Sequence, residues 1–584
     1  MITDRNRVQR IRIIAWCFSL TAFLVALTGI AFAQIIPSSR AVMWQGNVGV
    51  EGSIPNRTTL RNCVALYGAH ADGSNTADHI NTCLSSIGSG EVAYLPAGTY
   101  VVGSTIAIPA NKTLRGAGVD STIILSNSDF TPIVRIGNGY SSAAGINITS
   151  GYTKGSRQIV VTDASTISSG DFIRIDELND ETIPVTKVGL GGVCTWCSRE
   201  DGDRLRTQIV KVTAKTGNTL SFEPPFFFTF SSANAPQAQK LQQMTQYAGI
   251  ENLTIKNGSG TGARRNNLDF WSAANCWAKN IKIDTCGQRC IDIRLDNYRV
   301  EIRDSYITDC LNHTSSDTCY GIQLANSSSC LIENNVFYRT SDGPMLMWGA
   351  SGNVIGYNYL YDVHRDANLD SWFWPDSWAH GAHTSFNLYE GNIEVLHCED
   401  GYWGSNSHNT FFRNRFLGKM DNVTWVPGTS QTGAFITGET NNYMSLVGNV
   451  LGTGGFSDVY EEEAPSGNYA SKPIYGTGLF SDTKPFDTML RHYNYDYLTN
   501  STKHCEDAGE PGCQGGNGNH TLPGSLYLSS KPSFFGGCSW PAIGPDLSPM
   551  VKTLPAKARY EGSSACEGDT MPPQPPGNLR IVVP

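Results

Sequence analysis

The sequence between residues 335 and 451 repeats one pattern, an Asn followed within two residues by an apolar side chain: Asn335-Val-Phe337, Asn358-Tyr-Leu360, Asn392-Ile393, Asn414-Arg-Phe416 and Asn449-Val-Leu451. The steps between successive copies are 23, 34, 22 and 35 residues. We interpret them as coils of about 22–23 residues, two of which carry insertions of about a dozen residues.

Coils of this size are typical of a parallel β-helix, in which each turn is a few short strands stacked on the next turn. Asn suits the corner of such a coil because it tolerates left-handed backbone geometry, and its amide can bond to the Asn above and below. The pattern recurs less strictly upstream, at Asn252, Asn280 and Ser305. An antiparallel β-sandwich is the alternative, but it would show hairpin turns every 8–12 residues and no constant coil length.

Residues 75–87 predict a short helix that covers the N-terminal end of the solenoid. Asn75 can cap it, and Ala77, Ile80, Leu84 and Ile87 fall on one face. The prediction for the fold is therefore all-β: a single-stranded parallel β-helix with an N-terminal capping helix. Residues 150–240 interrupt the coil pattern and predict a small β insertion.

The first 33 residues have the features of a secretory signal. A start rich in Arg precedes an apolar run, and Ala31-Phe32-Ala33 offers a cleavage site. A retained membrane anchor is the alternative, because the run is nearly long enough to span a bilayer. We expect a secreted or periplasmic protein with no membrane association after cleavage.

The charge of the exported chain argues against nucleic acid as a partner. The whole chain has a net charge of −9, and residues 1–33 carry four Arg and one Asp, which leaves about −12 for the rest. Nucleic-acid binding needs a basic face.

Export makes disulfides plausible among the 15 Cys that follow the signal, and the odd number leaves at least one thiol free. Close spacing suggests four pairs: Cys194/Cys197, Cys286/Cys290, Cys310/Cys319 and Cys505/Cys513. A zinc site at Cys194 and Cys197 has no matching second pair nearby.

Three N-terminal stretches carry a family resemblance: Leu66-Tyr-Gly-Ala-His-Ala-Asp-Gly-Ser-Asn-Thr76, Val92-Ala-Tyr-Leu-Pro-Ala-Gly-Thr-Tyr100 and Leu114-Arg-Gly-Ala-Gly118. Over residues 60–135 the chain resembles pectate-lyase-like β-helix proteins. The resemblance implies a right-handed helix and places the chain near polysaccharide lyases, glycoside hydrolases, epimerases and phage tailspikes. It does not specify the reaction.

The sequence divides into six segments, and we expect the protein to be a monomer. They are a signal peptide (1–33), an N-terminal cap with the first coils (34–149), the β insertion (150–240), coils with the candidate site (241–455), C-terminal loops that cap the solenoid (456–566) and a Pro-rich tail (567–584).

Acidic residues recur seven or eight positions after the repeating Asn, at Asp342, Asp366, Glu399, Asp400 and Asp421. Because neighbouring coils are about 4.8 Å apart, Asp342 and Asp400 should lie roughly 9–10 Å apart in one lateral groove. This matches the upper edge of the separation of about 6.5–9.5 Å used by inverting glycosidases. Asp and Gly are also common turn formers, and a stacked Asp column can bind calcium.

Aromatic and His side chains gather near these acids and could contact sugar rings. The candidates for substrate binding are Trp348, Trp372, Trp374, Trp378, His380, Trp403 and His408. Any one of these His residues could equally have a structural role. His380 and His383 lack the Glu of a known zinc motif, so we expect no metal there.

Three hypotheses follow. The first is a glycoside hydrolase that uses Asp342, Asp366 and Asp400. The second is a polysaccharide lyase that uses His383 or Arg365 as the base. The third is a non-catalytic glycan-binding or adhesin solenoid. In each the partner is a polysaccharide and no cofactor is required, with calcium as an option for the lyase.

Overall fold

The computed structural model describes residues 35–139, 142–180, 194–258, 266–311, 319–365, 375–421, 432–438, 440–464, 469–477, 485–514 and 519–566. The predicted signal, the Pro-rich tail, Asp366, Trp372 and Trp374 lie outside these residues. Within them, no helix is both long and apolar enough to cross a membrane.

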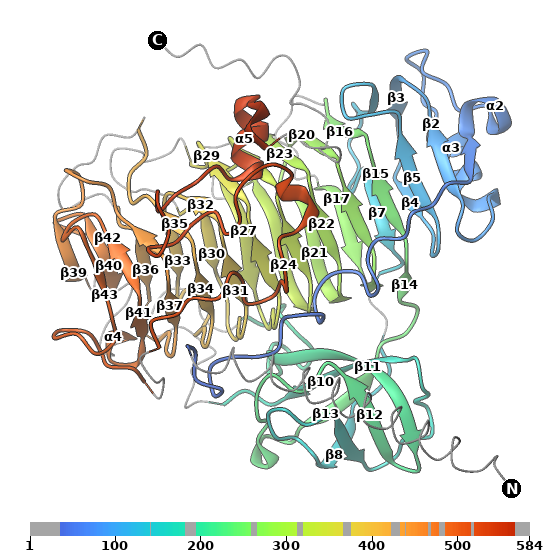
Figure 1. Cartoon of the computed structure of the whole chain (residues 1–584). Helices are drawn as coiled ribbons and strands as arrows, with labels where there is room; N and C mark the ends of the chain where they lie inside the picture. The colour runs from blue at the N-terminus through green and yellow to red at the C-terminus, as the bar shows by residue number, and fades with distance from the viewer. Residues whose placement is uncertain are drawn as a thin grey trace, which may run out of the picture.

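Three long sheets of parallel strands form the walls of a solenoid (Figure 1). Sheet A contains, in order, β1 (Leu60–Asn62), β2 (Val92–Leu95), β5 (Thr113–Gly116), β15 (Gly249–Glu251), β19 (Trp277–Lys279), β22 (Glu301–Arg303), β25 (Leu331–Glu333), β28 (Val354–Gly356), β31 (Leu388–Glu390), β34 (Thr410–Phe412), β37 (Ser445–Val447) and β41 (Leu490–His492).

Sheet B contains β3 (Gly98–Val102), β6 (Thr122–Ser126), β16 (Thr254–Asn257), β20 (Lys282–Cys286), β23 (Tyr306–Cys310), β26 (Val336–Tyr338), β29 (Tyr359–Tyr361), β32 (Ile393–Glu394), β35 (Arg415–Phe416), β38 (Val450–Leu451), β42 (Asn494–Asp496) and β43 (Ser501–Lys503). All of its strand pairs are parallel except the last, β42 with β43.

Sheet C contains β4 (Ile106–Ile108), β7 (Val134–Gly137), β17 (Asn266–Trp271), β21 (Arg289–Tyr298), β24 (Tyr320–Ser328), β27 (Asp342–Met347), β30 (Ser377–Ala379), β33 (His397–Glu399), β36 (Phe435–Thr437), β40 (Pro473–Thr477) and β39 (Val459–Glu463), with β14 (Thr245–Gln246) and β18 (Ala273–Ala274) beside it. Each coil contributes one strand to each sheet, as β25, β26 and β27 do, and the next coil repeats the order. The predicted right-handed parallel β-helix is confirmed.

The interior is filled by inward-pointing Ile, Leu, Val and Phe from all three sheets. The repeating Asn forms a buried ladder, in which Nδ2 of Asn335 donates to Oδ1 of Asn358 (3.1 Å), and Asn358 to Asn392 (3.1 Å). Each Oδ1 also accepts the backbone N–H of the ladder residue before it, at 2.9 Å for both pairs.

The left-handed residue of most coils is not the ladder Asn itself but the residue before it. Asn334, Tyr357 and Arg413 have φ of 54°, 56° and 53°. In two early coils an Asn of the predicted pattern does have left-handed backbone geometry, as expected: these are Asn252 and Asn280. The ladder Asn instead satisfies buried backbone groups, and the preceding residue makes the turn.

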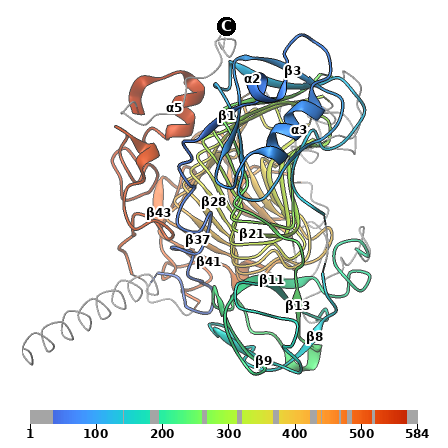
Figure 2. The ribbon, with the colours of Figure 1, turned by 90° about the vertical axis from the view of Figure 1, so that its right-hand side faces the viewer.

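Helix α3 (Ala77–Ser86) closes the N-terminal end, as predicted, beside the short helix α2 (Cys63–Tyr67) (Figure 2). Asn75 Oδ1 accepts the N–H of Ala77 at 3.1 Å, and Ala77, Ile80 and Leu84 are fully buried. Further helices are α4 (Pro485–Thr488), α5 (Pro555–Glu561), η1 (Ser232–Asn234), η2 (Ser533–Phe535) and η3 (Ser564–Cys566).

The predicted β insertion is a closed antiparallel barrel beside the solenoid (Figures 1 and 2). Its strands are β8 (Ile146–Ser150), β9 (Gln158–Val161), β10 (Phe172–Glu177), β11 (Arg206–Thr216), β12 (Thr219–Glu223) and β13 (Gln237–Lys240). The barrel has its own apolar core, which includes five Phe side chains from residues 222–230.

The C-terminal segment differs from the expected end cap, because residues 525–566 pack along the flank of the solenoid. Tyr527 OH donates to Glu333 Oε1 (2.6 Å), and Arg559 donates to the carbonyl of Asn334 (2.6 Å). Buried Glu333 and the carbonyl of Asn334 need partners. The other predicted segment boundaries stay predictions.

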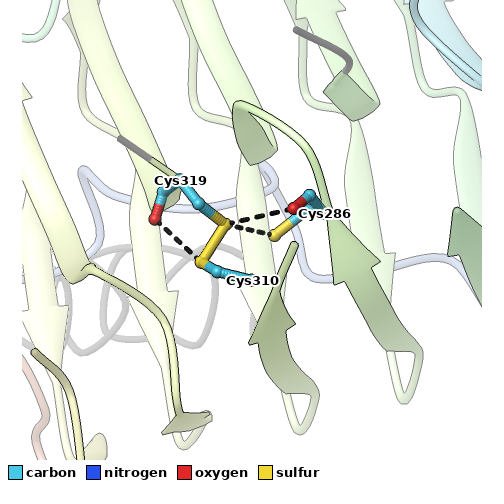
Figure 3. Close-up of side chains that lie close together, drawn as sticks. All are labelled: Cys286, Cys310 and Cys319. Carbon is cyan, nitrogen blue, oxygen red and sulfur yellow. Dashed lines mark hydrogen bonds between the residues drawn. A yellow bond between two sulfur atoms is a disulfide. The ribbon is translucent and has the colours of Figure 1, made fainter. Parts of the chain in front are cut away.

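The described residues contain six disulfides, and four of them are the pairs suggested by spacing. The other two join Cys63 to Cys83 and Cys538 to Cys566. Cys194 and Cys197 are therefore a disulfide rather than a metal site. Two of the bridges lie together, since Cys286 Sγ is 2.9 Å from Cys319 Sγ (Figure 3). Cys276, Cys330 and Cys398 are buried free thiols.

Candidate functional site

The outer face of sheet C carries a row of polar side chains in register across four coils. Strand pairing aligns Arg135, Asp269, Asp292 and Gln323 on neighbouring strands. Their sequence neighbours Leu268, Phe270, Ile291, Ile293, Ile322 and Leu324 belong to the solenoid core. Because side chains alternate along a strand, the row faces away from the core.

Asp269 and Asp292 form a close carboxylate pair at the centre of this row. Asn266 Nδ2 donates to Oδ1 of Asp269 (2.9 Å) and to Oδ2 of Asp292 (3.2 Å). Burial and the charge of Asp292 raise the pKa of Asp269 to about 7. Burial also raises the pKa of Asp292, opposed by Arg289 and Arg294. At neutral pH the pair can therefore hold one proton.

Three arginines and a tryptophan surround the pair. Arg294 Nε lies 3.6 Å from Oδ2 of Asp292, and Arg289 Nε lies 4.0 Å from the same atom. The guanidinium groups of Arg135 and Arg294 lie 5.0 and 5.7 Å from the ring centroid of Trp271. We call Asn266, Asp269, Trp271, Asp292, Gln323 and the arginines 135, 289 and 294 the acid-pair site.

The acid-pair site holds an unusual concentration of unsatisfied polar atoms. Among the described residues, six of its buried atoms have no hydrogen-bond partner: Arg135 Nε, Asn266 Oδ1, Trp271 Nε1, Asp292 Oδ1, Arg294 Nε and Gln323 Nε2. Buried polar groups are normally paired, and each exception calls for an explanation such as a catalytic role or a bound molecule. Three of the six, on Arg135, Asp292 and Gln323, belong to the row itself.

Sequence reasoning missed this site. The signal was present, because Asp269-Phe-Trp271 and Asp292-Ile-Arg294 have the same alternation of polar and apolar residues and lie 23 residues apart, one coil length. The repeating Asn is less regular in these early coils, so its spacing does not reveal that Asp269 and Asp292 occupy equivalent positions.

Part of the predicted site does come together farther along the same face. Asp400 Oδ2 is hydrogen-bonded to His380 Nδ1. The His380 ring lies 5.6 Å from both the Trp378 and the Tyr402 rings. Trp403 packs edge-on against Trp196, at 5.1 Å. The Trp196 side chain comes from the barrel insertion and is 59% exposed.

Asp342 and Arg365 form a second part of the predicted site. Asp342 is the first residue of β27 and pairs with Tyr320 of β24. Burial lowers the pKa of Arg365, and the negative charge of Asp342 opposes this shift. Asp342 is fully buried, Asp400 is 2% exposed and Trp348 is 6% exposed. The structure therefore does not show these carboxylates lining an open groove, as their shared column led us to expect. Asp269 and Asp292 of the acid-pair site, at 2% and 0% exposed, are buried to the same degree.

His383 and His408 lie away from this face. Burial lowers the pKa of each to about 3, so neither is a ready proton acceptor. His408 stacks on Phe386 (4.8 Å) and Tyr443 (5.0 Å). Both histidines lie at a packed corner of their coils. The nearby residues Ser385 and Ser407 form a parallel β-bridge there, just after the sheet C strands in the chain.

A pocket of about 430 Å³ opens elsewhere, on sheet A between residues 46–54 and 527–533. Three of its four charged side chains satisfy one another. Arg303 contacts Glu301 and Glu333, each at 3.1 Å, and Tyr527 donates to Glu333. It lacks the unpaired atoms of the acid-pair site, so we regard it as the weaker candidate.

No family model matches the chain. A pre-neck appendage protein of Bacillus phage B103 is 31% identical over 100 residues, which are 17% of this chain. The chain spans only 10% of the length of that relative.

Solved structures with a similar fold include the tailspike protein gp49 of Pseudomonas phage LKA1 (TM-score 0.42, 13% identity, 80% of this chain and 81% of that chain). The A-module of mannuronan C-5 epimerase AlgE4 of Azotobacter vinelandii has TM-score 0.37 and 13% identity over 72% of this chain and 99% of that one. The catalytic unit of an α-1,3-glucanase of Streptomyces thermodiastaticus has TM-score 0.33 and 12% identity over 78% and 73%.

These likenesses assign no reaction to this chain. The fold and the site together define a right-handed parallel β-helix protein, as the pectate-lyase-like resemblance implied. Its outer face carries a buried carboxylate pair among arginines.

Proposed function

We propose that the protein is an exported polysaccharide-degrading enzyme, a glycoside hydrolase that uses Asp269 and Asp292 as its paired carboxylates. The observation that supports this is the set of six unpaired buried polar atoms in the acid-pair site. A sugar offers hydroxyl groups that both donate and accept, so it can satisfy N–H donors and a carboxylate oxygen together.

The two carboxylates suit different roles. Asp269, whose pKa is raised to about 7, is the general acid that donates its proton to the glycosidic oxygen. Asp292 is the nucleophile that attacks the anomeric carbon, and water then releases the sugar while Asp269 acts as the base. Neighbouring coils are about 4.8 Å apart, which is closer to the retaining separation of about 5–5.5 Å than to the inverting one.

The Asp400 region extends this proposal to a long substrate. Asp400 lies on β33's coil, four coils from Asp292 on β21, or roughly 19 Å along the same face. His380, Trp378, Tyr402 and Trp403 there provide aromatic faces of the kind that stack on pyranose rings. We assign this region to binding of a distant part of the polysaccharide. Catalysis at Asp342, Asp366 and Asp400 is the competing assignment.

A polysaccharide lyase is the second candidate, and the three arginines favour it. Arg135, Arg289 and Arg294 bring more positive charge than the pair can neutralise when it holds one proton. They could neutralise the carboxylate of a uronate sugar, the step that a lyase needs before it removes the neighbouring proton. Arg365 and His383 lie outside the acid-pair site.

The test is digestion of a panel of neutral and uronate polysaccharides, with the products analysed by mass. A gain of water identifies hydrolysis, and unsaturated ends with ultraviolet absorbance identify a lyase. We expect Asp269→Asn and Asp292→Asn each to reduce kcat by about 10²- to 10⁴-fold. The matched control is Asp284→Asn, an ion-paired carboxylate on sheet B.

Two results would contradict the proposal. Full activity of both acid-pair variants together with its loss in Asp400→Asn would move catalysis to the Asp400 region. Binding to a glycan without any product across the panel would favour the adhesin.

A further inference from the structure

Three histidines converge near the C-terminal end of the solenoid, far from the acid-pair site along the chain. They are His492, His504 and His520, and one ring nitrogen of each lies within 4.8 Å of the others. The His504 and His520 rings are stacked, with centroids 4.1 Å apart and planes 10° apart. His492 is buried, and the side chain of His520 is 53% exposed.

The fold explains why these residues meet. His492 ends β41, and the antiparallel pairing of β42 with β43 returns the chain so that His504, which follows β43, lies beside His492. The disulfide Cys505–Cys513 closes the loop that carries Glu506. The carbonyl of Asn519, which precedes His520, accepts a hydrogen bond from His492 Nε2 at 2.9 Å.

Glu506 adds a carboxylate to the three rings. Its Oε1 is hydrogen-bonded to His520 Nε2, and its Oε2 lies 3.8 Å from His492 Nδ1. His492 Nδ1 also accepts a long bond of 3.3 Å from the backbone N–H of Cys505. Cys505 itself is in a disulfide and offers no thiolate.

One ring nitrogen in the cluster is unsatisfied. His504 Nδ1 is buried, and it has no hydrogen-bond partner among the described residues. Parallel stacking of two imidazoles with an unpaired nitrogen next to a carboxylate is unfavourable for a purely structural cluster, since it leaves a buried polar atom without a partner. A cation at the edge of the stacked rings, in the plane of the His504 ring, would satisfy it.

We propose that His492, His504, His520 and Glu506 form a structural zinc site. Imidazole and carboxylate are ligands that suit Zn²⁺, and four protein ligands complete its tetrahedral shell. Zinc–ligand bonds of about 2.0–2.2 Å require the ligand atoms to draw about an ångström closer, which side-chain rotation of exposed His520 and Glu506 allows. When the metal binds, His492 Nδ1 loses the long hydrogen bond from the backbone N–H of Cys505 and coordinates the ion instead. The ion ties residues 501–514 and His520 to the last coil.

The experiment uses the full exported chain without a histidine tag, stripped with a chelator and titrated with Zn²⁺ by calorimetry. We expect one ion per chain and a rise in the thermal unfolding midpoint, because a ligand that binds only the folded state stabilises it. His504→Ala and His520→Gln should each weaken binding by at least roughly tenfold and remove the rise.

The matched control is His70→Ala with His79→Ala, a second His pair with rings 5.2 Å apart beside Asp72. It should bind Zn²⁺ like the wild type. His520 is largely exposed, so its variant should fold even if His504→Ala does not. Absence of stoichiometric binding, equal binding by His520→Gln, or binding of Cu²⁺ or Ni²⁺ but not Zn²⁺ would overturn the proposal. Polysaccharide activity is a separate readout.

Discussion

At the scale of single residues, the most unusual feature is a line of ionisable groups inside the solenoid. Ser377 Oγ is hydrogen-bonded to Glu394 and lies 2.7 Å from His397 Nδ1. His397 Nε2 lies 3.2 Å from Glu399 Oε1, which also accepts from Asn409. The order Ser, His, Glu matches a nucleophilic triad, but all of these side chains are buried in the core. We therefore infer a structural role.

Burial raises the pKa of Glu394 to about 8, which makes its effect on stability depend on pH. A carboxyl group with a raised pKa in the folded state contributes stability fully below its unfolded pKa near 4.5, and this contribution is lost as pH rises to about 8. We expect Glu394→Gln to be more stable than the wild type at about pH 8 by a few kcal/mol, and to differ little at about pH 5. Denaturant midpoints at both pH values measure this.

The control for that prediction is exposed Glu463→Gln, which should show no such dependence. An equal stability change for Glu394→Gln at both pH values would mean that Glu394 is ionised in the folded protein.

At the scale of elements, the Asn ladder holds successive coils in register. It runs through residues 335, 358, 392, 414, 449 and 494, with side-chain bonds of 3.0–3.1 Å at every step. Because strand pairing alone tolerates sliding, a column of identical side chains that bond only in one alignment helps to fix the alignment of every sheet.

Replacing Asn358 with Ala should be strongly destabilising. It removes the acceptor of the Asn335 backbone N–H and Nδ2, and the donor to the carbonyl of Ile332. Each buried group left unpaired costs about 1–3 kcal/mol, so we expect a loss on the order of 3 kcal/mol in the free energy of unfolding. Chemical denaturation measures it, and Asn127→Ala, at an exposed turn, is the control. A loss no larger than that of the control would show that the ladder is dispensable.

At the scale of the whole molecule, the barrel docks on the solenoid through a buried ion pair. Arg174 of β10 donates to Asp296 of β21 at 2.8 Å, and both side chains are at most 2% exposed. Backbone contacts add to it, since the N–H of Ile209 donates to Ser328 Oγ at 3.0 Å. The barrel therefore rests on the strand that carries Asp292, and it supports the acid-pair face.

Asp296→Ala should loosen this docking. It removes the closer of the two carboxylates beside buried Arg174, since Asp176 stays 3.6 Å from Arg174 Nε. Breaking a buried pair costs at most about 3–5 kcal/mol. We expect faster proteolytic cleavage between the barrel and the solenoid in a time course. A double variant, Arg174→Met with Asp296→Leu, removes both charges and should restore resistance. Equal cleavage of the wild type and Asp296→Ala would show that the pair does not hold the barrel.

The repeating architecture can be predicted from local sequence patterns. The spacing of Asn335, Asn358 and their successors, the capping helix, the β insertion and four disulfide pairs all depend on residues close in the chain or on a constant period. Such features are encoded locally, so pattern alone reveals them. The same period suggested the acidic column that includes Asp400, and its role in the site stays a prediction.

Which acids face outward, and which side chains they contact, depends on how the coils stack in three dimensions. Glu399 and Asp400 are adjacent, yet Glu399 points into the core and Asp400 out to His380, because side chains alternate along a strand. Asp269 and Asp292 become a pair only once β17 and β21 are aligned. The three histidines near the C-terminus have no common period, since a hairpin and a disulfide bring them together. Contacts between residues so far apart depend on how the coils and loops close in space.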